Sequence, residues 1–197
     1  MSAEGLDPTG VMLRVTSVLE ALGVPYLVGG SMASIFHGMM RTTNDADLVA
    51  ELGMEHVDAF AAALRSTFYL DEESIRDAIQ TRSSFNAIHL DTMFKVDVFI
   101  SRRRPFDLAR FQRGARQTLL ASSGEGATMS SAEDAILAKL EWYRLGGEVS
   151  ERQWRDVLGV LKTQGARLDV AYLRTWAEGL GVLDLLERAF VSVDGNA

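Results

Sequence analysis

The sequence predicts an α+β protein, in which strands and helices are mixed up to about residue 122 and only helices follow. In the first part, short apolar runs and polar–apolar alternation are interleaved with apolar residues at three-four spacing. Beyond residue 122, the only recurring pattern is apolar residues at three-four spacing. We therefore expect an α/β domain over residues 1–122 and a C-terminal helical region over 127–193 that packs on it.

Each element of the first part has its own signal. Apolar residues at helical spacing, ending at Gly23, predict a first helix, and an apolar run into Gly29-Gly30 predicts a strand, a tight turn and a short helix. The further elements expected here are a strand at 45–49, helices at 54–67 and 72–80, and a hairpin made by the runs 84–90 and 93–100.

Beyond Gly124 and Gly126 we expect helices only. Ser131, three residues before Asp134, is typical of a capped helix start. Apolar residues at helical spacing predict a second helix around Trp154 and two more over 169–178 and 182–190.

The composition excludes several classes of protein. The 197 residues include no cysteine, which excludes a disulfide scaffold, a thiolate metal site and a cysteine nucleophile. The three histidines are not clustered, so carboxylates are the remaining metal-ligand candidates. The sequence shows no secretory leader and no run of about 18 apolar residues, and we expect a cytoplasmic protein that does not contact membranes.

A glycine-rich turn is the first candidate for binding chemistry. Gly29-Gly30-Ser31 opens a helix, where close backbone approach, free N–H groups and a partial positive charge favour a phosphate group. An ordinary tight turn is the alternative interpretation of the same residues.

Three aspartates form the second candidate. Asp45 and Asp47 are two apart on a predicted strand, so their carboxylates share one face and repel each other unless a cation such as Mg²⁺ relieves the repulsion. Asp97, on a later strand, would complete a two-metal site. A lone Asp-x-Asp is more commonly a solvated strand end.

The order of these features resembles the signature of the nucleotidyltransferase fold superfamily, which includes DNA polymerase beta and CCA-adding enzymes. The resemblance lies in the runs YLVGGSMASIFHGMMRTTNDADLV and FKVDVFI and covers residues 11–50 and 84–100. Within the superfamily, the chain is most similar to the AbiEii-like bacterial group, which contains toxins of toxin–antitoxin systems. The resemblance implies a small mixed β-sheet flanked by helices, with a C-terminal helical bundle.

Residue by residue, the resemblance implies the following roles. Ser31 and the backbone of Gly29 and Gly30 would hold the β- and γ-phosphates of an incoming NTP, and Asp45 and Asp47 would ligate Mg²⁺ (or Mn²⁺).

Asp97 would bind a second ion and help to deprotonate the acceptor hydroxyl. Arg41 and Thr43 would steady the loop before the first metal ligand or touch phosphate. For Arg41, a salt bridge to the acidic strand is an equal alternative.

The helical half matches the group less strictly. Lys139 would face the nucleotide, as would Arg152, Arg155 and Asp156 in a second stretch, where Arg155 replaces the usual lysine. A later aspartate of the group's pattern falls on Gly159.

An arginine-rich segment belongs to this sequence rather than to the signature. Residues 101–117 carry a net charge of +5, whereas the chain carries −7. We expect this segment to rim the active site, with Arg102, Arg103 and Arg104 near a polyanionic acceptor such as RNA or tRNA. The alternative is a solvated helix whose arginines pair with acidic surface residues.

The sequence thus predicts a metal-dependent nucleotidyltransferase, which moves a nucleoside monophosphate from an NTP to a hydroxyl on RNA, protein or a small molecule. A toxin that adds an antitoxin partner to the same chemistry is one alternative. A non-catalytic nucleotide- or partner-binding module of the same fold is the other.

Overall fold

The computed structural model describes residues 7–195. The chain divides into two compact units. The first contains the chain up to Gly29 together with Thr43–Met129, and the second contains Gly30–Thr42 together with the chain from Ser130. The strands of the sheet lie in the first unit, and the second unit is helical.

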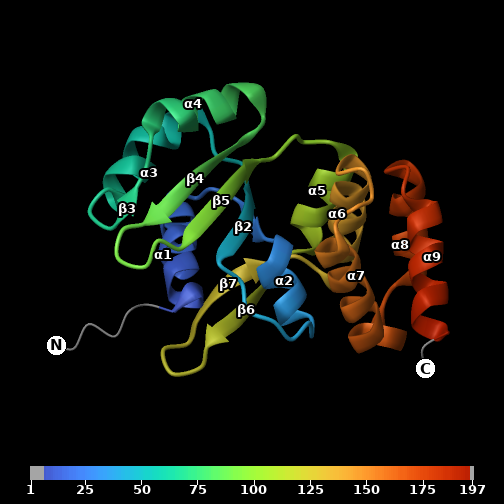
Figure 1. The fold of residues 1–197 in the computed structure, drawn as a ribbon. Helices are drawn as coiled ribbons and strands as arrows, with labels where there is room; N and C mark the ends of the chain where they lie inside the picture. The colour runs from blue at the N-terminus through green and yellow to red at the C-terminus, as the bar shows by residue number, and fades with distance from the viewer. Residues whose placement is uncertain (1–6, 196–197) are drawn as a thin grey trace. The chain divides into compact units, whose positions relative to one another are not determined.

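A seven-stranded mixed sheet organises the first unit (Figure 1). Its order is β3-β4-β5-β2-β1-β7-β6. The β2–β5 and β1–β7 pairs are parallel, and the other neighbours are antiparallel. The strands are β1 (Tyr26–Val28), β2 (Asp45–Ala50), β3 (Phe68–Tyr69), β4 (Ser84–His89), β5 (Lys95–Ile100), β6 (Ala115–Leu120) and β7 (Glu125–Met129).

Helices cover one face of this sheet, as Figure 1 shows for α1, α3 and α4. Every second residue of β2 and β5 is fully buried toward that face, and the ring of Phe60 on α3 meets that of Phe85 on β4 at 5.9 Å. The intervening residues of β2 and β5 point to the opposite face. The helices of this unit are α1 (Pro8–Ala21), the 3-10 turn η1 (Met54–His56), α3 (Val57–Leu64), α4 (Glu72–Thr81) and α5 (Pro105–Arg113).

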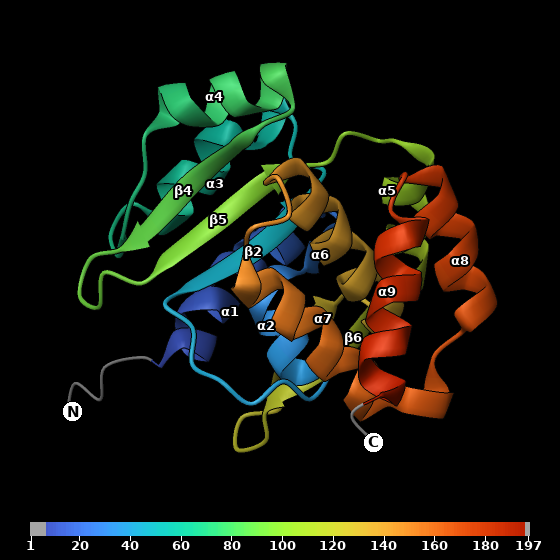
Figure 2. The ribbon, with the colours of Figure 1, turned by 45° about the vertical axis from the view of Figure 1, so that its right-hand side comes forward.

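The second unit is a helical bundle, seen from its side in Figure 2. Helices α6 and α7 pack side by side, α2 packs against both, and α9 packs against α7 and α8. Ser131 caps α6 by accepting the backbone N–H of Asp134, as the sequence predicts. The helices are α2 (Gly30–Phe36), α6 (Ala132–Leu145), α7 (Glu151–Gln164), the 3-10 turn η2 (Gly165–Arg167), α8 (Val170–Gly179) and α9 (Leu183–Asp194).

The predicted fold class is confirmed: a mixed sheet is flanked by helices, and a helical region follows it. The prediction of helices only beyond Gly124 is wrong, because 125–129 form β7 and pair with the equally unexpected β6. Strand β6 is exposed or half-buried throughout, so it lacks the apolar alternation that marks a strand in a sequence. The helix expected at 54–67 begins with a 3-10 turn and ends at Leu64.

Within the described range, 7–195, no helix has the length and apolar character needed to cross a bilayer.

Candidate active site

The three predicted aspartates lie on one face of the sheet. Strands β2 and β5 run parallel, with Asp45 level with Lys95 and Asp47 level with Asp97. Because side chains alternate along a strand, these four residues share the face opposite α1, α3 and α4. All four side chains are half-buried.

Lys95 places a cation on this face. Its Nζ donates to Oδ2 of Asp97 at 2.8 Å, and the side chains of Lys95 and Asp97 are 41% and 14% exposed. The hydrogen bond to Asp97 raises the pKa of Lys95, and the charges of Asp97, Asp45 and Asp47 raise it further, although partial burial opposes the shift. The ammonium therefore experiences the field of all three carboxylates.

Local hydrogen bonds hold Asp45 and Asp47 in place on this face. Thr43 Oγ1 donates to Oδ1 of Asp45 at 2.8 Å, which orients that carboxylate from the loop before β2. The backbone N–H of Gly29 donates to the carbonyl oxygen of Asp47 at 2.8 Å. The first residue of the predicted phosphate turn is thereby held beside the second aspartate, and Gly30 and Ser31 follow it in the chain.

The donor chemistry of Asp45 and Asp47 fits Mg²⁺, which prefers carboxylate oxygens and retains several of its waters. Asp97, the third predicted ligand, is engaged by Lys95. Among residues 7–195, no three His, Cys, Asp or Glu side chains are gathered closely enough to hold a metal ion. The assignment of a metal to these residues therefore remains a prediction.

A buried ionic cluster lies in the second unit. Asp156 on α7 is 1% exposed and accepts from Nε and Nη2 of Arg41 at 3.0 and 2.9 Å. Lys139 on α6 donates to the same carboxylate at 2.8 Å and to Oε1 of Gln153 at 3.0 Å. Nη2 of Arg41 also donates to Oγ of Ser31 at 2.5 Å. Four residues that the sequence analysis singled out, Ser31, Arg41, Lys139 and Asp156, are therefore joined in one network.

The charge state of Asp156 follows from this network. Burial alone would raise the pKa of Asp156, but the hydrogen bonds from Arg41 and Lys139 and the charges of both cations outweigh it and lower the pKa below its ordinary value. The salt bridge considered for Arg41 is thus made to α7, inside the second unit, and not to the aspartates of β2.

Two other positions of the helical half differ from the buried cluster. Arg152 lies one helical turn before Asp156, but its side chain is exposed. Gly159, where the resembled group has a later aspartate, lies against Met39, and a Cβ at residue 159 would overlap the sulfur of Met39. The glycine therefore makes room for a methionine of the loop that carries Arg41.

The arginine-rich segment is largely paired within the first unit. Arg103 pairs with Glu51 at 3.4 Å, Arg104 with Asp107 at 3.1 Å, and Arg116 with Glu20. Arg102 is exposed, whereas Arg110 is 7% exposed and lies over the ring of Phe106. The pairs with Glu51 and Glu20 match the alternative interpretation, in which the arginines pair with acidic surface residues, whereas Asp107 is buried.

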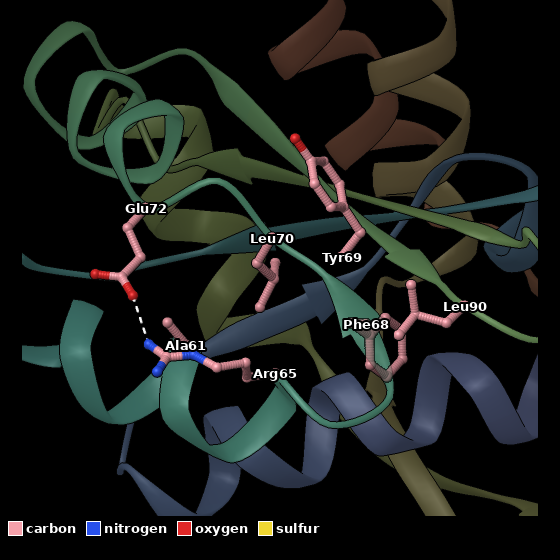
Figure 3. Close-up of a pocket in the computed structure, with 7 residues that line it drawn as sticks. All are labelled: Ala61, Arg65, Phe68, Tyr69, Leu70, Glu72 and Leu90. Atoms are coloured by element: carbon pink, nitrogen blue, oxygen red, sulfur yellow. Dashed lines mark hydrogen bonds and ion pairs between the residues drawn. The ribbon is translucent and has the colours of Figure 1, made fainter.

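A pocket of about 250 Å³ lies away from the predicted chemistry (Figure 3). Figure 3 shows Phe68, Tyr69 and Leu90 on one side and the Arg65–Glu72 ion pair on the other. Its lining contains none of the predicted site residues.

Sequence analysis assigned no role to Lys95 or Gln153. The signal for Lys95 was present, because the alternation that places Asp97 on the polar face places Lys95 there as well. Gln153 gave no such signal, since its contact with Lys139 joins two helices.

Comparisons with known proteins bear on the fold. No family model matches the sequence, and no curated protein matches it in sequence. Among solved structures, an antigenic nucleotidyltransferase-like protein from Paracoccidioides brasiliensis is similar, with a TM-score of 0.54 at 15% identity over 88% of this chain and 91% of that chain.

The antibiotic-resistance factor ANT(2'')-Ia is similar as well. Its solution structure gives a TM-score of 0.56 at 15% identity and covers 93% of this chain and 99% of that chain. Its crystal structure in complex with adenylyl-2''-tobramycin gives 0.55 at 14% identity, over 86% and 95% of the two chains. This chain therefore has the nucleotidyltransferase-like fold.

Proposed function

We propose that this protein is a metal-dependent nucleotidyltransferase, which transfers a nucleoside monophosphate from an NTP to a hydroxyl group. The observation that carries the proposal is the polar face of β2 and β5, where Asp47 and Asp97 stand level on neighbouring strands and Asp45 lies two residues away. The fold, shared with a protein named as nucleotidyltransferase-like, supports the same activity.

In this proposal the turn Gly29-Gly30-Ser31 holds the β- and γ-phosphates through its backbone N–H groups and the serine hydroxyl. Asp45 and Asp47 hold Mg²⁺, which when bound neutralises phosphate charge and aligns the α-phosphate. Thr43 supports this role by orienting Asp45. Arg41, Lys139 and Asp156, to which the resemblance gives a role toward the nucleotide, are joined in the buried ionic cluster of the second unit.

The reaction is an in-line displacement at the α-phosphorus. The acceptor oxygen forms a bond to phosphorus while the bond to the β-phosphate oxygen breaks, and pyrophosphate leaves with that electron pair. The acceptor proton passes to the carboxylate of Asp97, which is 14% exposed and so within reach of solvent and substrate.

We infer that the acceptor is a small molecule. Arg103 and Arg104 pair with Glu51 and Asp107, which lowers the net positive charge that this segment offers to an RNA backbone. The similar structure of ANT(2'')-Ia contains an adenylylated small molecule, adenylyl-2''-tobramycin. Transfer to RNA, tRNA or protein would contradict this inference.

We also propose the AbiEii-like group as the nearest branch, on the motif around Gly29 and Asp45. The exchange of the group's later aspartate for Gly159, with Met39 packed against it, separates this chain from that pattern in the helical half. An antitoxin partner is accordingly not part of the proposed function.

Label transfer tests the proposal. The protein is incubated with Mg²⁺ and each of the four α-³²P-labelled NTPs, together with a panel of hydroxylated small molecules, total RNA or cell lysate. We expect a labelled small molecule and released pyrophosphate, and neither product with the Asp45→Asn/Asp47→Asn variant. Label in RNA or protein would show that the acceptor is a macromolecule and contradict the inference of a small-molecule acceptor. No label and no pyrophosphate with any NTP would contradict the proposed function.

A further inference from the structure

The polar face of β2 and β5 contains its own cation. Lys95 lies level with Asp45 across the two strands, and its Nζ hydrogen-bonds to Asp97 at 2.8 Å. A lysine two residues from an aspartate on a solvated strand has many rotamers available. Here the side chain adopts the rotamer in which its ammonium contacts Asp97, the carboxylate predicted to bind the acceptor-side ion.

The contact has a consequence for metal binding. A second ion at Asp97 would have to displace an ammonium that already donates a charge-assisted hydrogen bond to that carboxylate. An ion placed there beside the ammonium would also meet the repulsion of its positive charge.

The pair is also half-buried. The side chain of Asp97 is 14% exposed and that of Lys95 41% exposed, so solvent screens their attraction only in part. Lysine carries a compact, strongly localised charge on a flexible stem. Its ammonium is therefore well suited to occupy the position of a small cation.

We infer that the Lys95 ammonium occupies the acceptor-side cation position at Asp97, so that the protein binds one divalent ion with its nucleotide and not two. This inference rests on the proposed function, which supplies the nucleotide and the ion at Asp45 and Asp47. Lys95 is then a positioning residue for Asp97, and it keeps that carboxylate directed at the acceptor.

Counting bound Mn²⁺ tests the inference without measuring activity. Equilibrium dialysis with Mn²⁺ and saturating α,β-methylene analogues of the four NTPs gives the number of ions per protein. We expect one ion for the wild type and two for Lys95→Met, with the affinity for the second ion raised roughly tenfold or more. The double variant Lys95→Met/Asp97→Asn should return to one ion.

Controls separate this effect from folding and from surface charge. Lys162→Met removes an exposed lysine of α7 and should leave one ion. Lys95→Gln provides a second neutral variant, and circular dichroism shows that each variant is folded.

Two ions in the wild type, or one ion in both folded neutral variants, would overturn the inference and leave the proposed function standing. No bound ion in any of these proteins would overturn both.

Discussion

Asp97 and Asp156 each accept a hydrogen bond from a lysine, but they differ in burial and in number of partners. Asp97 meets Lys95 on a half-exposed sheet face, while Asp156 is 1% exposed and shared by Arg41 and Lys139. A carboxylate that solvent and substrate can reach is available for proton transfer, whereas one enclosed by two cations mainly holds its neighbours in place. We therefore expect opposite consequences when each is neutralised.

Asp97→Asn should affect turnover far more than nucleotide binding. The amide keeps the shape but cannot accept the acceptor proton, so kcat should fall roughly 100-fold or more while the dissociation constant of Mg·NTP changes little. Steady-state kinetics with calorimetry measure the two effects separately. Asp91→Asn, in the exposed turn between β4 and β5, is the matched control. Equal losses of binding and rate would instead make Asp97 a nucleotide-side ligand.

Asp156→Asn should destabilise the protein. It leaves the buried Lys139 and the half-buried Arg41 without their carboxylate, at a cost of about 3–5 kcal/mol in the free energy of unfolding. Urea denaturation measures this, with Asp184→Asn as a control at the exposed pair with Arg144, where we expect little change. A similar small change in both variants would contradict the buried role of Asp156.

The same carboxylate predicts a pH dependence. Because the folded-state pKa of Asp156 is lower than its ordinary value of 3.8, its stabilising effect is complete above that value and is lost as the pH falls through the lower folded-state pKa. Wild-type stability should therefore decrease below about pH 4, and Asp156→Asn should decrease less steeply over the same range. Parallel curves would rule out this assignment.

At the scale of elements, the β6–β7 hairpin depends on one glycine. A Cβ at Gly126 would overlap the carbonyl oxygen of Gln117 and lie 2.8 Å from the carbonyl carbon, so the two backbones could not remain paired. Gly126→Ala should lower the free energy of unfolding by about 1–3 kcal/mol. Gly179→Ala, at the end of α8 with open space around its Cβ, is the control, and equal denaturation midpoints would contradict the prediction.

The elements show what the sequence could predict. Strands β2 and β5 and the common face of Asp45, Asp47 and Asp97 follow from alternation, which is a local property. Strands β6 and β3 could not be predicted from the sequence, because β6 lacks apolar alternation and β3 has only two residues.

The candidate site shows the same division. The residue types were predictable, but their partners depend on contacts distant in sequence. Arg41 and Asp156 are 115 residues apart, and no local pattern indicates that they pair. The assignment of Gly30–Thr42 to the helical unit is another contact property that the linear order does not show.

For the whole molecule, a net charge of −7 and paired arginines argue against RNA as a partner. Replacing Arg102, Arg103 and Arg104 by Gln should leave the salt dependence of RNA binding unchanged. Electrophoretic binding at three salt concentrations measures the slope. A decrease of about 0.7–0.9 in that slope for each arginine replaced would show phosphate contacts and favour a nucleic-acid acceptor.

The most direct test of the central claim is calorimetry of Mg·NTP binding. In the wild type we expect binding that requires Mg²⁺. Asp45→Asn/Asp47→Asn should abolish it while the fold stays intact or gains stability, since a repulsion between like charges is removed. Asp77→Asn/Asp91→Asn changes two exposed carboxylates by the same charge and should bind as the wild type does. Undiminished affinity in the Asp45→Asn/Asp47→Asn variant would contradict the assignment of the metal and nucleotide to this face.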